Sequence, residues 1–278
     1  MKRLMLVAAL LLGAVNLNAQ RAEYVADKII LNHDDLLAVI MVYNGTSVMD
    51  VRRSTFDATS SYMRANLDGR KVVDYHANPV IGLRAKGLEP LLEGLYYDGF
   101  THIIFQPTAL SYSESIEKLK ESAKSPASSF KEVRFAKPLI YDADDCKSVA
   151  QGLKGEVSTS SDAVVLVVDK GYESLSAQDR EMMLSALRGE GLNNFSIANG
   201  DDAEGVADLL SKSGVKSVAL LPFTFVSGVK SAGDVTANMG KVLESKGYKV
   251  ELINKGLGEY GFIHQMMVDH ILFSIDHK

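Results

Sequence analysis

Short apolar runs alternate along the chain with longer segments whose apolar residues recur at helical spacing. Ala163 to Val168 is one such run, and it leads directly into Asp169, Lys170 and Gly171. Runs that are apolar at every position are typical of strands buried on both faces of a parallel sheet. The pattern predicts strands near 36–43, 71–76, 102–106, 132–138, 163–168, 193–197, 217–221 and 249–253. It predicts helices near 49–67, 87–98, 113–124, 144–153, 176–189, 203–213, 231–246 and 261–275.

The alternation of strands and helices predicts an α/β fold, and the chain also repeats itself weakly. VIMVYNG at 39–45 resembles VLVVDKG at 165–171, and GFTHIIFQP at 99–107 resembles GVKSVALLP at 214–222. Any doubly wound fold produces some repetition of this kind. A sharper interpretation is two similar α/β halves, each a parallel sheet flanked by helices, that face each other across a cleft.

We place the N-terminal half at 20–140 and the C-terminal half at 141–278, with the Ser-rich stretch 120–130 as part of the crossing between them. Residues 1–19 have a positive start, an apolar core and a small-residue exit, which is the pattern of a secretory signal peptide. We therefore expect an exported, periplasmic protein that begins near Gln20, although an uncleaved anchor is the alternative.

The composition narrows the choice of partners. Net charge is −5 and no basic run occurs, which argues against nucleic acid as a ligand. No second long apolar stretch follows the N-terminal one, so we expect no stable membrane insertion. Cys146 is the only cysteine, which excludes an intrachain disulfide, and 46% hydrophobic residues supply a core instead. Whether the protein forms a homo-oligomer stays open.

Ligands of open α/β sheets bind at the carboxyl ends of the strands, which points to the loops 43–48, 107–114, 169–174 and 222–230. The first loop offers a tight turn, hydroxyls and backbone N–H groups to an anion, or simply caps the next helix. Its candidate substrate-binding residues are Tyr43, Asn44, Gly45, Thr46 and Ser47.

In the second loop, Tyr112 precedes Glu114 and Glu117, which share one face of the next helix. These carboxylates either point into the cleft as catalytic groups or only favour the helix dipole.

The third and fourth loops contain Lys170 and Lys230. Each lysine is either solvated or faces the cleft. Two ammonium groups about 4 Å apart would repel by roughly 4 kcal/mol at an effective dielectric near 20, so a shared cleft must be wet or bind a carboxylate or phosphate.

The histidines give no obvious metal site. His264 and His270 are six residues apart on an expected helix, so they cannot hold one ion from a single face. His102 begins an apolar strand and is interpreted as structural. We assign no metal ligand from these patterns.

Taken together, the segments VYNGTS, LLPFTFVSGV and GLGE, with the ending NKGLGEYGFIHQMMVDHI, resemble the anaerobic sirohydrochlorin cobalt chelatases of the class II chelatase family. The similarity covers about 36–273. It implies two α/β halves with a tetrapyrrole in the cleft between them. It also implies divalent cobalt or iron as a substrate, with no certain cofactor.

The resemblance further implies a His before the Gly that ends the first strand of the second half, and another two residues after the Gly of the Val-x-Gly turn. This chain has Lys170 before Gly171, and Lys230 after Gly228. Glu114, or else Glu117, is the nearest match to the family's glutamate. These four charged residues are the catalytic candidates, with Tyr112, Gly171, Phe223 and Gly228 added as substrate-binding candidates.

The two lysines change the expected chemistry. A lysine near its ordinary pKa keeps a proton on its only nitrogen, whereas a neutral histidine has a free lone pair for a metal. The expected functions are therefore metal insertion into a tetrapyrrole, binding of haem or another tetrapyrrole without catalysis, or binding of a small anion between two lobes.

Overall fold

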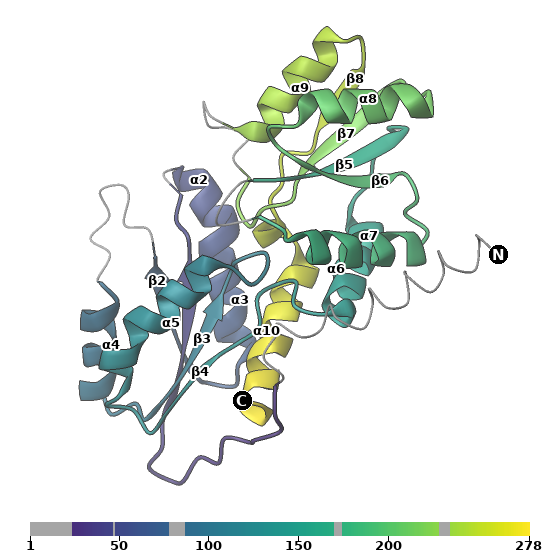
Figure 1. Cartoon of the computed structure of the whole chain (residues 1–278). Helices are drawn as coiled ribbons and strands as arrows, with labels where there is room; N and C mark the ends of the chain where they lie inside the picture. The colour runs from purple at the N-terminus through teal and green to yellow at the C-terminus, as the bar shows by residue number, and fades with distance from the viewer. Residues whose placement is uncertain (1–23, 47, 78–86, 170–173, 228–233) are drawn as a thin grey trace, which may run out of the picture.

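The computed structural model describes residues 24–46, 48–77, 87–169, 174–227 and 234–278. They form two four-stranded sheets in which every strand pair is parallel, with helices on both faces of each sheet (Figure 1). The expected α/β fold with two similar halves is therefore confirmed. Each of the eight expected strands is present within a few residues of its expected position.

The first half contains β1 (Leu37–Tyr43), α2 (Met49–Arg52), η1 (Arg53–Asp57), α3 (Ala58–Asn66), β2 (Lys71–His76), α4 (Leu88–Tyr97), β3 (His102–Pro107), α5 (Glu114–Ala127) and β4 (Glu132–Phe135). The second contains α6 (Ala143–Glu156), β5 (Ala163–Val168), α7 (Ala177–Gly189), β6 (Phe195–Asn199), α8 (Ala203–Ser213), β7 (Ser217–Pro222), α9 (Val235–Ser245), β8 (Lys249–Leu252), η2 (Leu257–Glu259) and α10 (Gly261–Asp276).

The two sheets have the same topology. Their strand orders are β2-β1-β3-β4 and β6-β5-β7-β8, so the first strand of each half lies inside its sheet. Every residue of β1 and of β5 is buried, which explains why these strands are apolar at every position. Gly99 and Gly214 both have positive φ before β3 and β7, and Pro107 and Pro222 end those strands. The weak repeat in the sequence is thus a repeat in structure.

The expected crossing between the halves was placed wrongly. Residues 120–127 of the Ser-rich stretch belong to α5, because Leu119 and Ala123 recur at helical spacing and are buried against the first sheet. The chain passes to the second half only after β4, on the way to α6.

Each sheet has an outer core of its own. On the outer face of the first sheet, Ile40 and Phe105 pack in one cluster with apolar residues of α4 and α5. On the outer face of the second, Val165 and Leu220 pack in another cluster with residues of α8 and α9. Alternate residues of the strands point to the opposite faces, which belong to a third, shared cluster.

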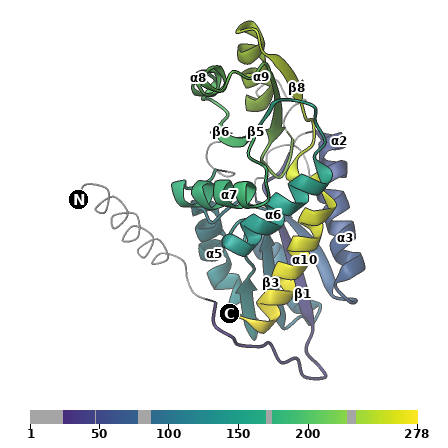
Figure 2. The same cartoon turned by 90° about the vertical axis from the view of Figure 1, so that its right-hand side faces the viewer.

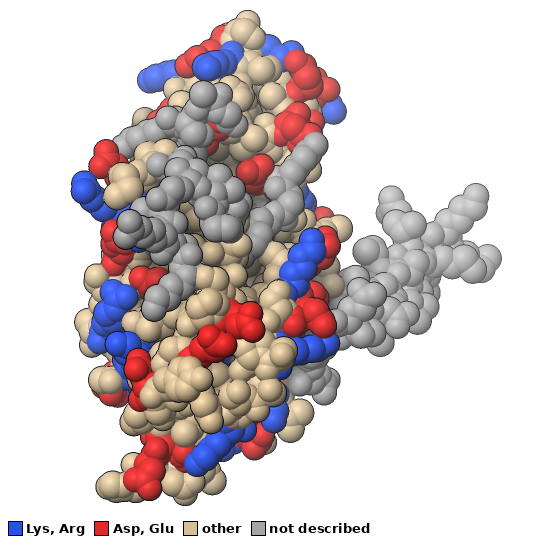
Figure 3. All heavy atoms as spheres, turned by 90° about the vertical axis from the view of Figure 1, so that its left-hand side faces the viewer, with Lys and Arg blue, Asp and Glu red and all other residues tan. Residues whose placement is uncertain are grey.

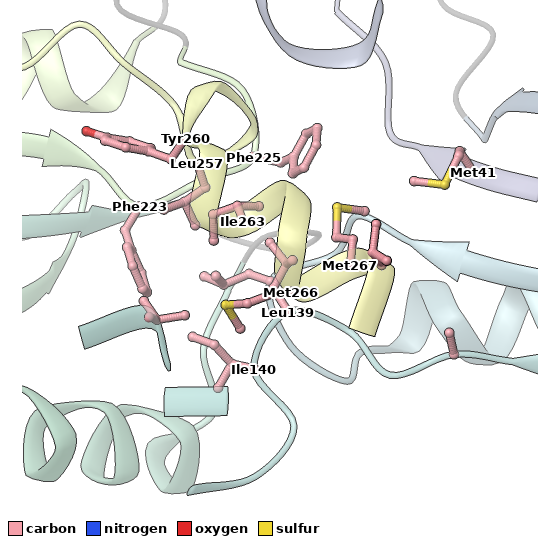
Figure 4. Close-up of a cluster of buried hydrophobic side chains, with 14 of the residues drawn as sticks. Met41, Leu139, Ile140, Phe223, Phe225, Leu257, Tyr260, Ile263, Met266 and Met267 are labelled. Carbon is pink, nitrogen blue, oxygen red and sulfur yellow. The ribbon is translucent and has the colours of Figure 1, made fainter. Parts of the chain in front are cut away.

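Helix α10 lies within this shared cluster and joins the two halves. It runs from the second half alongside α6 to the first sheet (Figures 1 and 2). In Figure 4, Met267 lies on the side of α10 toward Met41 of β1, and Ile263 lies on the side toward Phe223. A helix that is apolar on most sides is typical of a position inside a core rather than on a surface.

Polar contacts also join α10 to each of the two halves. The imidazole Nε2 of His270 lies 2.9 Å from Oδ1 of Asp145, which joins α10 to the start of α6 in a buried pair. Arg134 of β4 is buried and donates to the backbone carbonyls of Ser274, Ile275 and His277. Because the last carbonyls of a helix have no partners within it, this arginine supplies a donor to the end of α10, together with the N–H of Ile29, which also donates to the Ile275 carbonyl.

No helix among the described residues is long and apolar enough to cross a membrane.

Replacement of Met267 by Ala tests the shared core. Met267 is fully buried in the cluster that includes both sheets, so its truncation leaves a cavity that costs about 2–5 kcal/mol. The measurement is urea unfolding. Leu272→Ala on the same helix is the matched control, because Leu272 is 39% exposed and its loss costs about 1 kcal/mol or less. Equal losses in the two variants would contradict a joining role for α10.

Candidate functional site

The carboxyl ends of the inner strands have the same backbone pattern in both halves. The N–H of Thr108 donates to the carbonyl of Val42 at 3.0 Å, and the N–H of Phe223 donates to the carbonyl of Val167 at 2.7 Å. Val42 and Val167 are therefore equivalent positions. This differs by one residue from the alignment that matches the two glycines of the sequence repeat.

Loops of the two halves meet at these strand ends. Ser111, after β3, donates its hydroxyl to the backbone carbonyl of Ser174, after β5, at 3.0 Å. The ring of Phe225, after β7, stacks on Phe56 of the first half with centroids 6.1 Å apart. It also lies 6.1 Å from the ring of Tyr43. We call this region, where loops from the carboxyl ends of both sheets touch, the junction.

Two of the candidate substrate-binding residues are core residues under the junction. Tyr43 is fully buried, and its hydroxyl hydrogen-bonds Ser60 at 2.6 Å and the Phe56 carbonyl at 3.2 Å. Burial raises the pKa of this phenol, so it stays neutral. Phe223 is also fully buried in the shared cluster. Both side chains shape the base of the junction and present no exposed surface to a ligand.

The remaining described part of the first loop is half-buried. Gly45 has a φ of 106°, which favours glycine, and Thr46 accepts from the N–H of Val48 at 3.3 Å. The hydroxyl of Thr46 thus bonds the residue that precedes α2, and this helix has no side-chain cap of the kind the capping interpretation expects. Asn44 is half-buried beside it.

The glutamates of the second loop are on the surface of α5. The Glu114 carboxylate is 81% exposed and pairs with Lys118 at 2.8 Å. Hydrogen bonding to Lys118 holds the pKa of Glu114 below its usual range, so this group is ionised at neutral pH and is poorly suited to donate a proton. Glu117 accepts from the Tyr112 hydroxyl and from Lys120, in a second exposed cluster.

The other candidates lie outside the described residues: Ser47, Lys170, Gly171, Gly228 and Lys230. Near the second-half strand ends, the described chain adds Asp234, which caps α9 by accepting from the N–H of Ala237 at 2.7 Å. Burial raises the pKa of Asp234, and the neighbouring carboxylate of Asp169 adds to that effect.

His76 is a residue that the sequence interpretation passed over. It ends β2 and lies opposite Tyr43 in the parallel register. Its imidazole stacks on the Tyr43 ring with centroids 5.6 Å apart and lies 5.7 Å from Phe56. Burial lowers the pKa of the His76 imidazole, Arg52 adds to this, and Asp74 and Asp57 oppose it. The rule that placed the other loops, the carboxyl end of a strand, also applies to β2 and would have found it.

The other buried histidines have structural partners. His102 contacts Thr101, His264 contacts the Gly258 carbonyl, and His270 contacts Asp145. Within the described ranges, no three His, Cys, Asp or Glu side chains are grouped so that they could hold a metal ion.

A groove of about 550 Å³ lies at the opposite end of the first sheet, where β1 and β2 begin. Two of its charged residues are paired, since Asp35 bonds Lys131 at 2.7 Å and Arg64 bonds Asp74 at 3.3 Å. On the face shown in Figure 3, acidic and basic side chains are interspersed over the described part of the surface.

Two parallel sheets of identical order, with their strand ends meeting at a junction, define a two-lobed α/β protein. The family of cobalt chelatases (CbiK) matches residues 37–276, and the chain belongs to this family. The proposed resemblance is thereby confirmed at the level of the family. No curated protein matches the chain in sequence.

Solved structures agree on the fold. SirB from Bacillus subtilis with Fe³⁺ is 15% identical, with a TM-score of 0.63 over 86% of this chain and 96% of that one. The sirohydrochlorin chelatase SirB from Bacillus subtilis subspecies spizizenii with cobalt is 14% identical, with a TM-score of 0.60 over 86% and 95%. DR2241 from Deinococcus radiodurans, described as similar to chelatases with two additional domains, is 14% identical, with a TM-score of 0.56 over 84% and 54%.

The lowered pKa of His76 predicts a pH dependence of stability. The folded state binds this proton less tightly than the unfolded state does, so the stability present above an ordinary histidine pKa of about 6.5 is lost as the pH falls through the folded value. Between about pH 7 and pH 5, the wild type should lose more unfolding free energy than His76→Gln. Urea unfolding at each pH measures both.

His264, whose pKa burial also lowers, is present in both proteins and cancels in the comparison. His33→Gln is the control, because the His33 side chain is fully exposed and its replacement should leave the pH dependence as in the wild type. Parallel curves for the wild type and His76→Gln would show that burial does not suppress the charge on this imidazole.

Proposed function

We propose that the protein binds a tetrapyrrole at the junction and handles its metal there. The observation that supports this most is the match of the cobalt chelatase family over residues 37–276, almost the whole of the described chain. The junction supports the location, because strand-end loops of both halves meet there, as the general rule for ligand sites in open α/β sheets requires.

Binding of the macrocycle is better supported than efficient insertion of a bare metal ion. Insertion requires groups that hold the ion and accept the pyrrole protons. Lys170 and Lys230 stand where the family resemblance implies histidines, and a protonated amine has no lone pair to give. Within the described residues, Glu114 and Glu117 are exposed and bonded to lysines of their own helix.

The same two lysines favour binding of the macrocycle itself. Tetrapyrroles have several carboxylates, and ammonium groups bind carboxylates through charge-assisted hydrogen bonds. A cation in place of a neutral imidazole therefore lowers the affinity of the site for a metal ion. It raises the affinity for the carboxylates at the edge of a tetrapyrrole. The proposal is a tetrapyrrole-binding member of a chelatase family, with metal insertion slow or absent.

Absorption spectra test the proposal. Purified protein mixed with ferric haem should shift the Soret band, and mixed with sirohydrochlorin and Co²⁺ it should add little to the uncatalysed rate of insertion. A Lys170→His, Lys230→His double variant should gain insertion activity, with Lys118→His, Lys120→His on the exposed face of α5 as the matched control.

Two results would contradict the proposal in different ways. Efficient cobalt insertion by the wild type would make it an active chelatase and remove the argument from the lysines. No spectral change with either tetrapyrrole would leave the two-lobed binding protein for a small anion as the remaining function.

We further propose that the protein is exported, on the basis of residues 1–19. The secreted chain should begin near Gln20, which the intact mass of the protein in the periplasmic fraction measures. Leu11→Arg, which places a charge in the apolar core of the signal, should retain the precursor in the cell, whereas Leu11→Ile should not. A wild-type chain that keeps residues 1–19 in the cytoplasmic fraction would rule out export.

A further inference from the structure

His76 stands out among the described histidines because its imidazole makes no polar contact. Across the described ranges, no hydrogen bond or ion pair involves its ring, and the contacts it makes are the aromatic ones with Tyr43 and Phe56. The residue as a whole is half-buried rather than fully buried. A nitrogen lone pair without a partner is thus available beside the junction.

The surroundings hold this ring in a defined orientation. Tyr43 is itself fixed by hydrogen bonds to Ser60 and to the Phe56 carbonyl, and Ser60 donates to Asp74 at 2.6 Å. Phe56 stacks on Phe225, which comes from the second half. The aromatic rings therefore connect His76 to the region where both halves meet. Phe56 lies in the π-helical turn η1, a local distortion that recurs at functional sites.

The number of ligands decides which metal this histidine could hold. A bare ion such as Zn²⁺ or Co²⁺ needs several protein ligands, and the described residues offer no group of three. A metal at the centre of a tetrapyrrole already has four nitrogen ligands and needs a single axial one. One unpartnered imidazole fits the second case and not the first.

We propose that His76 is an axial ligand to the metal of a metallated tetrapyrrole bound at the junction. The inference rests on the proposed function, and it names the form of the macrocycle that the site prefers: one that already contains its metal. Bond formation uses the lone pair of the imidazole and releases no group from the protein. The lowered pKa of His76 agrees with this role, because the neutral ring needs no deprotonation before it binds.

The experiment compares ferric haem with metal-free protoporphyrin, which share the macrocycle and its carboxylates. Haem is followed by its Soret band and protoporphyrin by its fluorescence. His76→Phe retains an aromatic ring against Tyr43 and Phe56 but removes the nitrogens, and His76→Ala removes the ring. Both variants should bind haem about tenfold more weakly or worse with a displaced Soret band, and bind protoporphyrin within about twofold of the wild type.

Added imidazole should restore the wild-type Soret position in His76→Ala, because the free ring can occupy the space of the lost side chain. His33→Ala is the matched control, since its side chain is fully exposed, and it should bind both compounds as the wild type does. Protoporphyrin binding also reports that each variant is folded. Electron paramagnetic resonance of the wild-type haem complex, which needs no variant, should show a nitrogen axial ligand.

The outcomes separate this inference from the proposed function. If the wild type binds both compounds and His76→Phe keeps the wild-type haem affinity and spectrum, the macrocycle binds and the axial role is wrong. If the wild type binds neither compound, the proposed function fails and the axial role fails with it. A wild-type haem complex without a nitrogen axial ligand would also overturn the inference.

Discussion

The position of α10 in one apolar cluster with residues of both sheets is the constraint on which the rest of the structure depends. Each sheet covers its outer face with its own helices, α4 and α5 or α8 and α9, and could bury that face alone. The inner faces cannot be separated in this way, because residues of β1, β5 and α10 belong to one continuous apolar cluster. Burial of apolar surface is the dominant favourable term in folding, so this shared cluster, which includes α10, holds the two halves together.

The position of the strand ends follows from that core. Because α10 and α6 fix the sheets relative to each other, the loops after β1 and β3 of one half reach those after β5 and β7 of the other. The buried Asp145–His270 pair adds a specific contact between α6 and α10. A pair of this kind costs desolvation energy and is weak evidence for stability, but breaking one partner alone is strongly destabilising, so it defines the register in which the helices pack.

The sequence was sufficient for the fold because the strands are apolar at consecutive positions and the helices follow at regular spacing. The sequence was insufficient to place α10. The apolar residues of this helix indicate that it is buried, but they do not indicate which elements pack against it. The partners Asp145 and His270 are 125 positions apart, and no local pattern relates them. The Ser-rich stretch misled for the opposite reason, since serines and lysines are compatible with the solvent face of a helix such as α5.

The meeting of the strand-end loops was predicted, whereas the positions of their side chains were predicted less well. The final residues of β1, such as Tyr43, still alternate between the two faces of the sheet, so this ring points into the shared core while its backbone ends the strand. The sequence criterion was whether two histidines such as His264 and His270 could share an ion, and His76 was not considered under it. A histidine that acts alone, beside a metal with ligands of its own, falls outside that criterion.

The internal repeat makes the two sides of the junction comparable and shows that they differ in chemistry. The register of strand-end hydrogen bonds matches Val42 with Val167, and therefore Tyr43 with Val168. The aromatic stack of Tyr43, Phe56 and His76 consequently has no equivalent on the second sheet, whose strand ends instead contribute the carboxylates of Asp169 and Asp234. A ligand at the junction would thus meet the half-buried residue His76 from one half and carboxylates from the other. One duplicated scaffold can therefore present different chemistry at its two sets of strand ends without any change in backbone topology.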